Sequence, residues 1–274
     1  MRFAGAKEGG KITVVGIPYE GVLSGLPGTR EGPHYVRRAS YLLESYVPEL
    51  DVDLQELPFV DMGDVELFGP PERVCGEVEE IVTGVGLPVL IGGDHSITVG
   101  AVKALRKRYG RMEVLYFDAH LDLRDEFGES THSHACSAAR IAETGTNIRF
   151  FGVRSGTREE WRKAGKMKVF GAEDDWPRNF SDPIYITVDM DVFDPAFAPG
   201  VGTAEPAGIT PAKFFKWLHG LEGRIIGFDV VETNPLVENK ITPVLAAKIV
   251  RDAIAKIWMG CVAEKGKDAP AKGI

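Results

Sequence analysis

The chain of 274 residues is 44% hydrophobic and 26% charged, and its formal net charge is −8. This balance is typical of a globular protein with a large core, and the acidic surplus argues against a nucleic-acid partner, which would require a basic face. The chain has neither an apolar run of membrane-spanning length nor an apolar signal core, so we expect a soluble, cytoplasmic protein without a membrane partner.

Short apolar runs alternate with longer amphipathic segments along the chain. The runs are rich in β-branched and aromatic residues, which predicts buried strands at Lys11–Pro18, Pro88–Ile91, Glu113–Asp118, Ile148–Val153, Pro183–Asp189 and Arg224–Asp229. Between them, apolar residues at helical spacing and prolines at helix starts predict helices at Ile97–Tyr109, Pro211–Leu218 and Pro243–Trp258.

This alternation predicts an α/β fold in which helices flank a mostly parallel sheet. No internal repeat or linker divides the chain, so we expect one domain over residues 1–260 and a polar, flexible tail over residues 261–274. The cysteines at 75, 136 and 261 form no C-x-x-C pair, which fits thiols in a reducing compartment.

Acidic residues and histidines follow four of the predicted strands. These strands lead into Gly92-Gly93-Asp94-His95, Asp118-Ala119-His120-Leu121-Asp122, Asp189-Met190-Asp191 and Asp229-Val230-Val231-Glu232. In an open α/β sheet, ligands bind at the carboxyl ends of the strands, so we expect a site there. Alternate residues of an extended chain point the same way, which would bring Asp118, His120 and Asp122 together, and likewise Asp189 and Asp191.

So many carboxylates cannot all ionise in one poorly solvated cleft without a cation. Four aspartates and two histidines without a cysteine form an oxygen-rich ligand set, which favours Mn²⁺, Mg²⁺ or Fe²⁺ over a structural Zn²⁺, and the histidines disfavour Mg²⁺. Six ligands are too many for one catalytic ion, so two ions that share bridging carboxylates fit better.

Each of these motifs has a simpler explanation when it stands alone. An Asp-x-Asp pair is usually a turn or a cap, and Asp94 could cap the helix that begins near Ile97. Their occurrence together at the ends of separate predicted strands is what favours the metal site.

The same residues resemble a known family. The segments GGDHS (residues 92–96), DAHLD (118–122), TVDMDVFDPAFAPG (187–200) and VVETNP (231–235) resemble motifs of the ureohydrolases, the binuclear manganese enzymes that include arginase and agmatinase. Residues 16–37 (GIPYEGVLSGLPGTREGPHYVR) are also similar to that family, most of all to its agmatinase branch. The resemblance implies a three-layer α/β/α sandwich, two Mn²⁺ per subunit and a homo-trimer or homo-hexamer.

The resemblance also implies roles for individual residues. His95, Asp118, Asp122 and Asp189 would hold one manganese ion, and His120, Asp118, Asp189 and Asp191 would hold the other. Glu232 matches the glutamate that receives the guanidinium group. A histidine after DAHLD acts as a proton shuttle in the family. His134 matches it best, whereas we expect His132 to be a loop residue, with contact to the substrate as the alternative.

The expected reaction is the hydrolysis of a small cationic guanidino compound, namely agmatine to putrescine and urea. A metal-bridging hydroxide would attack the guanidinium carbon, with Glu232 orienting its NH₂ groups, Asp122 accepting a hydrogen bond and His134 relaying a proton. Residues 123–134 lack the Ser-Gly-Asn stretch by which arginases recognise arginine, and Thr187, Ala204 and Ala207 depart from common family residues.

Several alternatives remain open. Another ureohydrolase would use the same metals on aminopropylagmatine, guanidinobutyrate, formiminoglutamate or arginine. A two-metal phosphoesterase would need cationic groups where Glu232 stands, and a single-zinc deacetylase would not require both aspartate pairs. A non-catalytic, metal-stabilised family member would not need Glu232.

Overall fold

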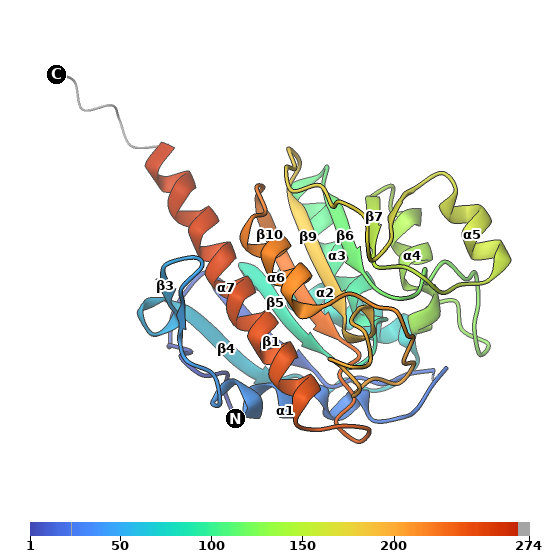
Figure 1. Cartoon of the computed structure of the whole chain (residues 1–274), viewed down its shortest axis with the longest axis horizontal. Coiled ribbons are helices and arrows are strands. Elements are labelled where there is room, and N and C mark those ends of the chain that lie inside the picture. The colour runs from blue at the N-terminus through green and yellow to red at the C-terminus, as the bar shows by residue number, and fades with distance from the viewer. Residues whose placement is uncertain (23, 268–274) are drawn as a thin grey trace.

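The computed structural model describes residues 1–22 and 24–267, and an eight-stranded sheet forms its centre (Figure 1). The strands, in their spatial order, are β4 (Phe59–Asp64), β1 (Ile12–Ile17), β5 (Leu87–Gly92), β10 (Ile225–Val231), β9 (Ile184–Asp189), β6 (Glu113–Phe117), β7 (Asn147–Phe151) and β8 (Lys168–Phe170). Every neighbouring pair in this sheet is parallel. A small antiparallel pair, β2 (Tyr46–Val47) and β3 (Val52–Asp53), lies outside it.

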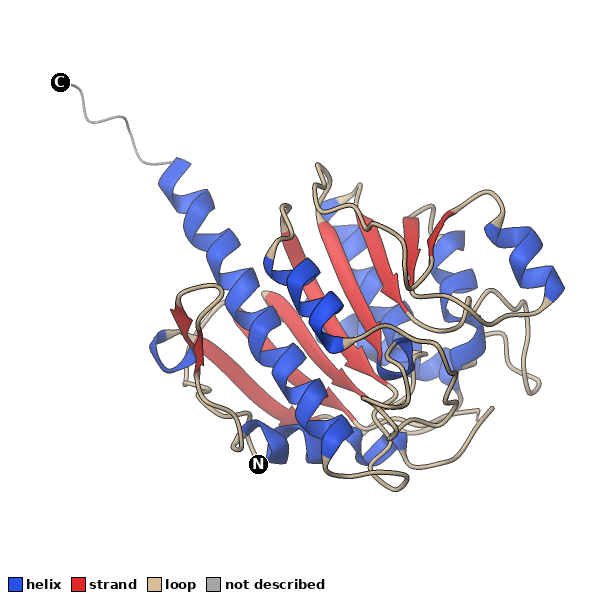
Figure 2. Cartoon of the chain, in the orientation of Figure 1, coloured by secondary structure: helices blue, strands red, loops and turns tan. Residues whose placement is uncertain are grey.

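Helices cover both faces of the sheet (Figure 2). One face packs against α1 (Gly32–Ser40), α6 (Pro211–His219) and α7 (Ile241–Lys267), and the other against α2 (Pro71–Thr83), α3 (Ile97–Tyr109) and α4 (Ser137–Glu143). The remaining helix α5 (Arg158–Ala164) follows β7, and short 3₁₀ helices are η1 (Thr29–Glu31), η2 (Leu54–Glu56), η3 (His134–Cys136) and η4 (Met190–Val192). The predicted three-layer α/β/α sandwich is therefore confirmed.

The alternation of side chains along each strand builds two apolar layers. Val14 and Val89 belong to the buried cluster that includes α6 and α7, whereas their neighbours Val15 and Leu90 belong to the cluster that includes α2 and α3. Because both faces of each central strand are covered, the strands are almost uniformly apolar, and polar residues collect where the strands end.

The predicted strands and helices are present with small shifts at their ends. The strand β10 continues to Val231, so Asp229 lies inside it and not at its end as predicted. The helix α7 continues to Lys267, past the predicted boundary at residue 260, because Ala, Glu and Lys in this stretch favour helix. Residues 268–274 lie outside the described part, so the division into domain and tail stays a prediction.

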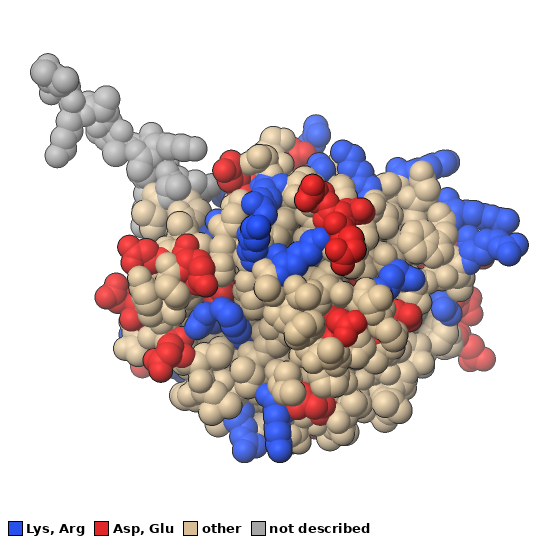
Figure 3. All heavy atoms as spheres, in the orientation of Figure 1, with Lys and Arg blue, Asp and Glu red and all other residues tan. Residues whose placement is uncertain are grey.

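The surface carries both signs of charge. On the face drawn in Figure 3, acidic and basic side chains are interspersed and form no continuous basic stripe. None of the described helices combines the length and the apolar character needed to cross a membrane.

Candidate metal centre

The residues predicted to form the site come from four adjacent strands. β5, β10, β9 and β6 are consecutive in the sheet, and their carboxyl ends lead to His95, Glu232, the Asp189–Asp191 segment and the Asp118–Asp122 segment respectively. Neighbouring parallel strands end at one edge of the sheet, so these side chains meet there.

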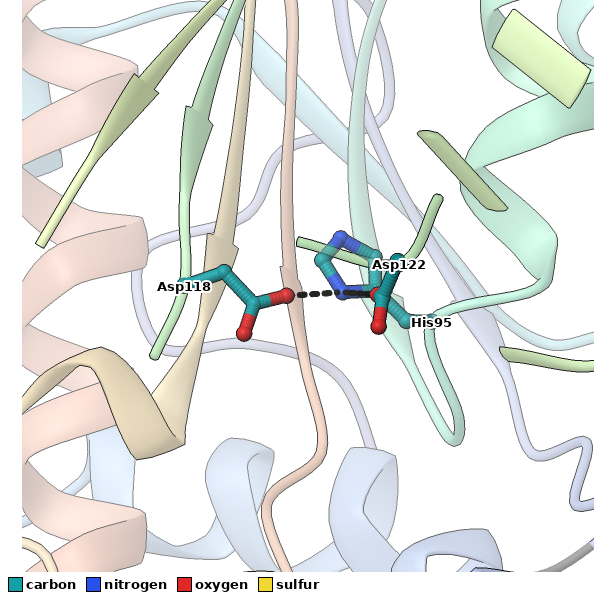
Figure 4. A group of neighbouring side chains, drawn as sticks. All are labelled: His95, Asp118 and Asp122. Atoms are coloured by element: carbon teal, nitrogen blue, oxygen red, sulfur yellow. Dashed lines mark ion pairs between the residues drawn. The ribbon is translucent and has the colours of Figure 1, made fainter. Parts of the chain in front are cut away.

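The first group of possible ligands surrounds the Nδ1 atom of His95 (Figure 4). This nitrogen lies 3.1 Å from Oδ2 of Asp118, 3.3 Å from Oδ2 of Asp189 and 3.5 Å from Oδ2 of Asp122. The Tyr116 hydroxyl donates to Oδ2 of Asp122 at 2.7 Å and lies 3.2 Å from the same Nδ1. Three carboxylates thus converge on one imidazole nitrogen.

The other nitrogen of His95 faces away from these carboxylates. Its Nε2 lies 2.8 Å from Oγ1 of Thr187, and the Thr187 hydroxyl donates at 2.5 Å to Asp229. The Thr187 oxygen therefore accepts a hydrogen bond from the N–H at Nε2, which leaves Nδ1 to bind a cation. Hydroxyls of Thr98 and Tyr185 also donate to the fully buried Asp229 carboxylate.

The second group joins Asp118, His120 and Asp191. Nδ1 of His120 lies 2.9 Å from Oδ2 of Asp191 and 3.4 Å from Oδ1 of Asp118. The two oxygens of Asp118 therefore face different histidines, Oδ2 toward His95 and Oδ1 toward His120. This is the arrangement of a carboxylate that can bridge two cations.

The segment from Asp118 to Asp122 is bent and not extended as predicted. The strand β6 ends at Phe117, and the backbone N–H of His120 turns back to donate to Oδ1 of Asp118 at 2.6 Å. Asp122 then has a left-handed backbone with φ 48°, which an aspartate tolerates better than most residues. As a result Asp118 belongs to both groups, Asp122 only to the first and His120 only to the second, so the three side chains do not meet at one point as predicted.

The Asp189–Asp191 segment is also shaped by its own carboxylate. Oδ1 of Asp189 accepts the backbone N–H of Asp191 at 2.8 Å and so caps the short helix η4. The second oxygen of Asp189 remains directed at His95. Asp191 accepts the backbone N–H of Ala119 at 3.1 Å and the Thr203 hydroxyl at 3.1 Å, which fixes its carboxylate.

The electrostatics of these groups call for positive charge. Burial, with Asp118 beside it, raises the pKa of Asp122 to about 8, and burial beside Asp191 and Asp118 raises the pKa of Asp189 well above its ordinary range. Burial disfavours the imidazolium of His120, but Asp191 and Asp118 outweigh it and raise the pKa to about 12. Protons thus compensate the carboxylates in the absence of a metal.

One buried atom points specifically to a cation. Oδ2 of Asp118 is buried and accepts no hydrogen bond within the described part of the chain. A carboxylate oxygen in this state is costly unless a positive charge contacts it. The residues present therefore fit the two metal ions that the ligand set predicts.

Glu232 and His134 lie together beside this centre. Oε1 of Glu232 accepts the backbone N–H of His95 at 2.9 Å and lies 3.1 Å from Nδ1 of His134. Burial disfavours the imidazolium of His134, but the hydrogen bond to Glu232 outweighs burial and raises the pKa of His134 to about 9. His132, in contrast, contacts Thr131 and lies 3.8 Å from Glu72 of α2, away from these residues.

A cavity of about 390 Å³ opens onto the group. Its lining includes the predicted site residues His120, Asp122, His134, Asp189 and Asp191. The other lining residues, to which the sequence assigned no role, are Ser24, Arg124, Ala135, Ser155, Gly156, Thr157, Glu160 and Thr203. The cavity therefore combines acidic, metal-ligating side chains with mixed polar ones.

Sequence reasoning missed several contributors to the site. Tyr116 belongs to an apolar run and gave no polar signal, although its hydroxyl contacts Asp122. Asp229 was identified as an acid near the strand end, but it lies beneath His95 and is directed at Thr187. Asp229 lies within β10, whereas Glu232 follows the end of this strand. A sequence prediction that ended β10 at Val231 would have separated the two residues.

Comparison with known proteins finds relatives along nearly the whole chain. A model of the Arginase family matches residues 10–255. The chain is 37% identical to an agmatinase of Pyrococcus horikoshii, covering 86% of this chain and 88% of the relative. It is 34% identical to an N(1)-aminopropylagmatine ureohydrolase of Thermococcus kodakarensis, covering 89% of both chains.

The fold is also similar to solved structures. The agmatine ureohydrolase of Thermoplasma volcanium superimposes with a TM-score of 0.86 at 33% identity, covering 96% of each chain. The similarity in sequence and the similarity in fold therefore both extend over nearly the whole chain.

Proposed function

Because the chain belongs to the arginase family and is a hydrolase that acts on guanidino C–N bonds, we propose that it hydrolyses agmatine to putrescine and urea. The observation that carries this proposal is the convergence of three carboxylates on Nδ1 of His95, beside Glu232 and a cavity. Relatives that are named for agmatine and for aminopropylagmatine support the substrate class.

Two divalent cations, proposed to be Mn²⁺, would complete the centre. The residues that would hold one are His95, Asp118, Asp122 and Asp189, and those that would hold the other are His120, Asp118, Asp189 and Asp191. When bound, the ions supply a water of lowered pKa as the nucleophile for the guanidinium carbon. Carboxylates and imidazoles together suit Mn²⁺ better than Mg²⁺ or a thiolate-preferring metal.

Glu232 would bind the guanidinium group of the substrate. Its Oε1 is held by the backbone N–H of His95, so the carboxylate has a fixed position relative to the metal ligands. Paired, charge-assisted hydrogen bonds from two NH₂ groups to a carboxylate orient a planar cation. The guanidinium carbon would thereby be presented to the nucleophile.

His134 would move a proton between solvent and the leaving amine. Its Nδ1 faces Glu232, whereas its Nε2 lies 2.8 Å from the hydroxyl of Ser24, which lines the cavity. An imidazole between the Glu232 carboxylate and the exposed Ser24 hydroxyl can donate a proton to the amine nitrogen and be reprotonated from solvent. Asp122, with its Tyr116 hydrogen bond, would accept a hydrogen bond from the tetrahedral intermediate.

We also propose a location in the cell and an oligomeric state. Cys75 and Cys136 are buried thiols, which supports a cytoplasmic location. We propose a homo-trimer or homo-hexamer, as the resemblance implies.

One observation favours a second substrate class. The Arg124 side chain lines the cavity, and its Nε lies 3.6 Å from Oε2 of Glu160. A cation on the cavity wall attracts a substrate carboxylate and repels the distal ammonium of agmatine, although the neighbouring Glu160 reduces this effect. A guanidino acid such as guanidinobutyrate is therefore the alternative substrate, and a human guanidino acid hydrolase is 31% identical.

A substrate panel separates these proposals. The manganese-loaded full-length protein is assayed with agmatine, aminopropylagmatine, guanidinobutyrate, arginine and formiminoglutamate, and release of urea or formamide is measured. We expect the highest kcat/KM with agmatine, and no release by protein stripped of metal. If kcat/KM is at least tenfold higher for another compound, that compound replaces agmatine as the proposed substrate. If no compound releases urea or formamide, the proposed hydrolytic activity is refuted.

A further inference from the structure

A residue after β7 contacts both metal-ligand loops. The backbone N–H groups of Arg154 and Ser155 both donate to the carbonyl of Ala119 at 2.9 Å. Ala119 stands between Asp118 and His120, and its own N–H donates to Oδ1 of Asp191 at 3.1 Å. The backbone at Arg154 therefore fixes the middle of the turn that presents two of the predicted ligands.

The side chain of Arg154 holds the other loop. Its guanidinium donates to the carbonyls of Asp191 at 2.7 Å, Val192 at 3.2 Å and Phe193 at 3.5 Å. These carbonyls lie at the C-terminal end of η4, the helix that Asp189 caps at its other end. Further acceptors of the same group are the carbonyls of Gly152, Glu205 and Pro206.

Few side chains can make this set of contacts. A guanidinium carries five donors in a rigid plane, and a cation stabilises the carbonyl end of a helix. A lysine keeps the charge but has one compact ammonium with three donors, so it cannot reach carbonyls on both sides of the loop. Arg154 is thus selected by geometry as well as by charge.

The contacts of Arg154 are unequally distributed between the two ligand groups. The Arg154 backbone contacts the Ala119 carbonyl and its guanidinium contacts the Asp191 carbonyl, and both carbonyls belong to the loops that carry the Asp118–His120–Asp191 group. The His95–Asp118–Asp122 group is supported by other contacts, from Thr187 to His95 and from Tyr116 to Asp122, and the Asp122 carbonyl accepts the N–H of Ala139.

We propose that Arg154 is a positioning residue that sets the separation of His120 and Asp191 and thereby determines the affinity of one of the two metal ions. This proposal rests on the two-metal centre proposed above. Loss of the guanidinium would leave the ion at His95 in place and release the ion at His120.

The test is equilibrium dialysis of the full-length protein against graded free Mn²⁺, with bound manganese per subunit measured by elemental analysis. We expect two ions on the wild type. In Arg154→Lys and Arg154→Gln, the first binding step should change by less than about twofold, and the second should weaken by about tenfold or more.

Arg108 provides a matched control. Its guanidinium donates to the carbonyls of Val82, Thr83 and Gly86 at the C-terminal end of α2, at the opposite edge of the sheet. Arg108→Gln should therefore bind two ions with wild-type affinities. If Arg154→Gln does not fold, as judged by circular dichroism, Arg154→Lys carries the test.

The outcomes separate this proposal from the one on which it rests. Unchanged binding in a folded Arg154 variant overturns the positioning role, and so does equal weakening of both steps, which indicates a general structural role. Fewer than two ions on the wild type would instead refute the two-metal centre.

Discussion

Nδ1 of His134 lies 3.1 Å from Oε1 of Glu232, and the same oxygen accepts the backbone N–H of His95 at 2.9 Å. One carboxylate oxygen therefore links the proposed proton carrier to the loop of a metal ligand. A bound guanidinium would compete with His134 for this carboxylate, so substrate binding and the proton affinity of His134 are coupled.

Glu232→Gln tests the role of that carboxylate. The amide keeps the size of the side chain but cannot accept from two cationic NH₂ groups, so we expect kcat/KM for agmatine to fall about 10²-fold or more. Both metals should remain, since Glu232 is outside the two ligand groups. Steady-state urea release and manganese analysis measure the two effects, and wild-type kinetics would rule out guanidinium binding by Glu232.

The pKa of His134 provides a second prediction. It is raised to about 9 from 6.5 in the folded protein, so the His134–Glu232 pair stabilises the fold fully below pH 6.5 and loses this contribution as the pH rises through about 9. In metal-free Glu232→Gln only burial and more distant acids remain, and the pKa should fall by a unit or more. NMR titration of the imidazole checks this, and an unchanged pKa would contradict it.

Metal binding should release protons. Without a cation, the pKa of His120 is about 12 and that of Asp122 about 8, so both groups hold protons at pH 7. Metal ligands must be deprotonated, so Mn²⁺ displaces these protons. Calorimetric titration of stripped protein in buffers of different ionisation enthalpy should give a net release of more than one proton per subunit. Zero release would mean that the ligands are already deprotonated.

Thr187 should control how well His95 binds metal. Thr187→Val removes both the acceptor for Nε2 of His95 and the donor to Asp229, and we expect about 10–100-fold weaker manganese binding. Thr187→Ser retains the hydroxyl and is the matched control, with affinity near that of the wild type. Equal affinities of the Val and Ser variants in equilibrium dialysis would show that the hydroxyl does not orient His95.

Ala207 offers a prediction about stability. It has φ 65°, a left-handed conformation that is strained for alanine, and its N–H donates to Oδ2 of Asp194 at 2.8 Å. Glycine adopts this conformation freely, so Ala207→Gly should stabilise the protein by about 0.5–1 kcal/mol, the relief of strain less the extra unfolded-state entropy. Denaturant unfolding measures the change, and a loss of stability would mean that the alanine is unstrained.

The sheet and the polar residues at the ends of its strands could both be predicted from the apolar character of the strands. Strands buried on both faces must be apolar throughout, so the change from Phe117 to Asp118 marks both the end of a strand and the start of a site. The helical spacing of apolar residues likewise predicts a helix such as α3. Motif resemblance then selected His134 over His132, and the structure directs the two rings to different neighbours.

Contacts of side chains with backbone groups could not be predicted. Arg154 gives no signal in the sequence, because its acceptors are carbonyl oxygens that every residue carries. The bend from Asp118 to Asp122 was missed because it depends on a side chain that accepts its neighbour's N–H, not on residue spacing. Asp229 was misjudged because only the true end of β10 shows that it lies beneath the site.

Two of the acids in the site, Asp122 and Glu232, have left-handed backbones with φ 48° and 62°. The left-handed conformation strains Ala207, but at Asp122 and Glu232 it directs a carboxylate toward the proposed metal centre. Random mutagenesis scored by heat resistance alone would therefore tend to reward glycine at these two positions and discard the chemistry. Evolution of a more robust variant has to be screened for turnover in parallel, since at these residues durability and activity select opposite side chains.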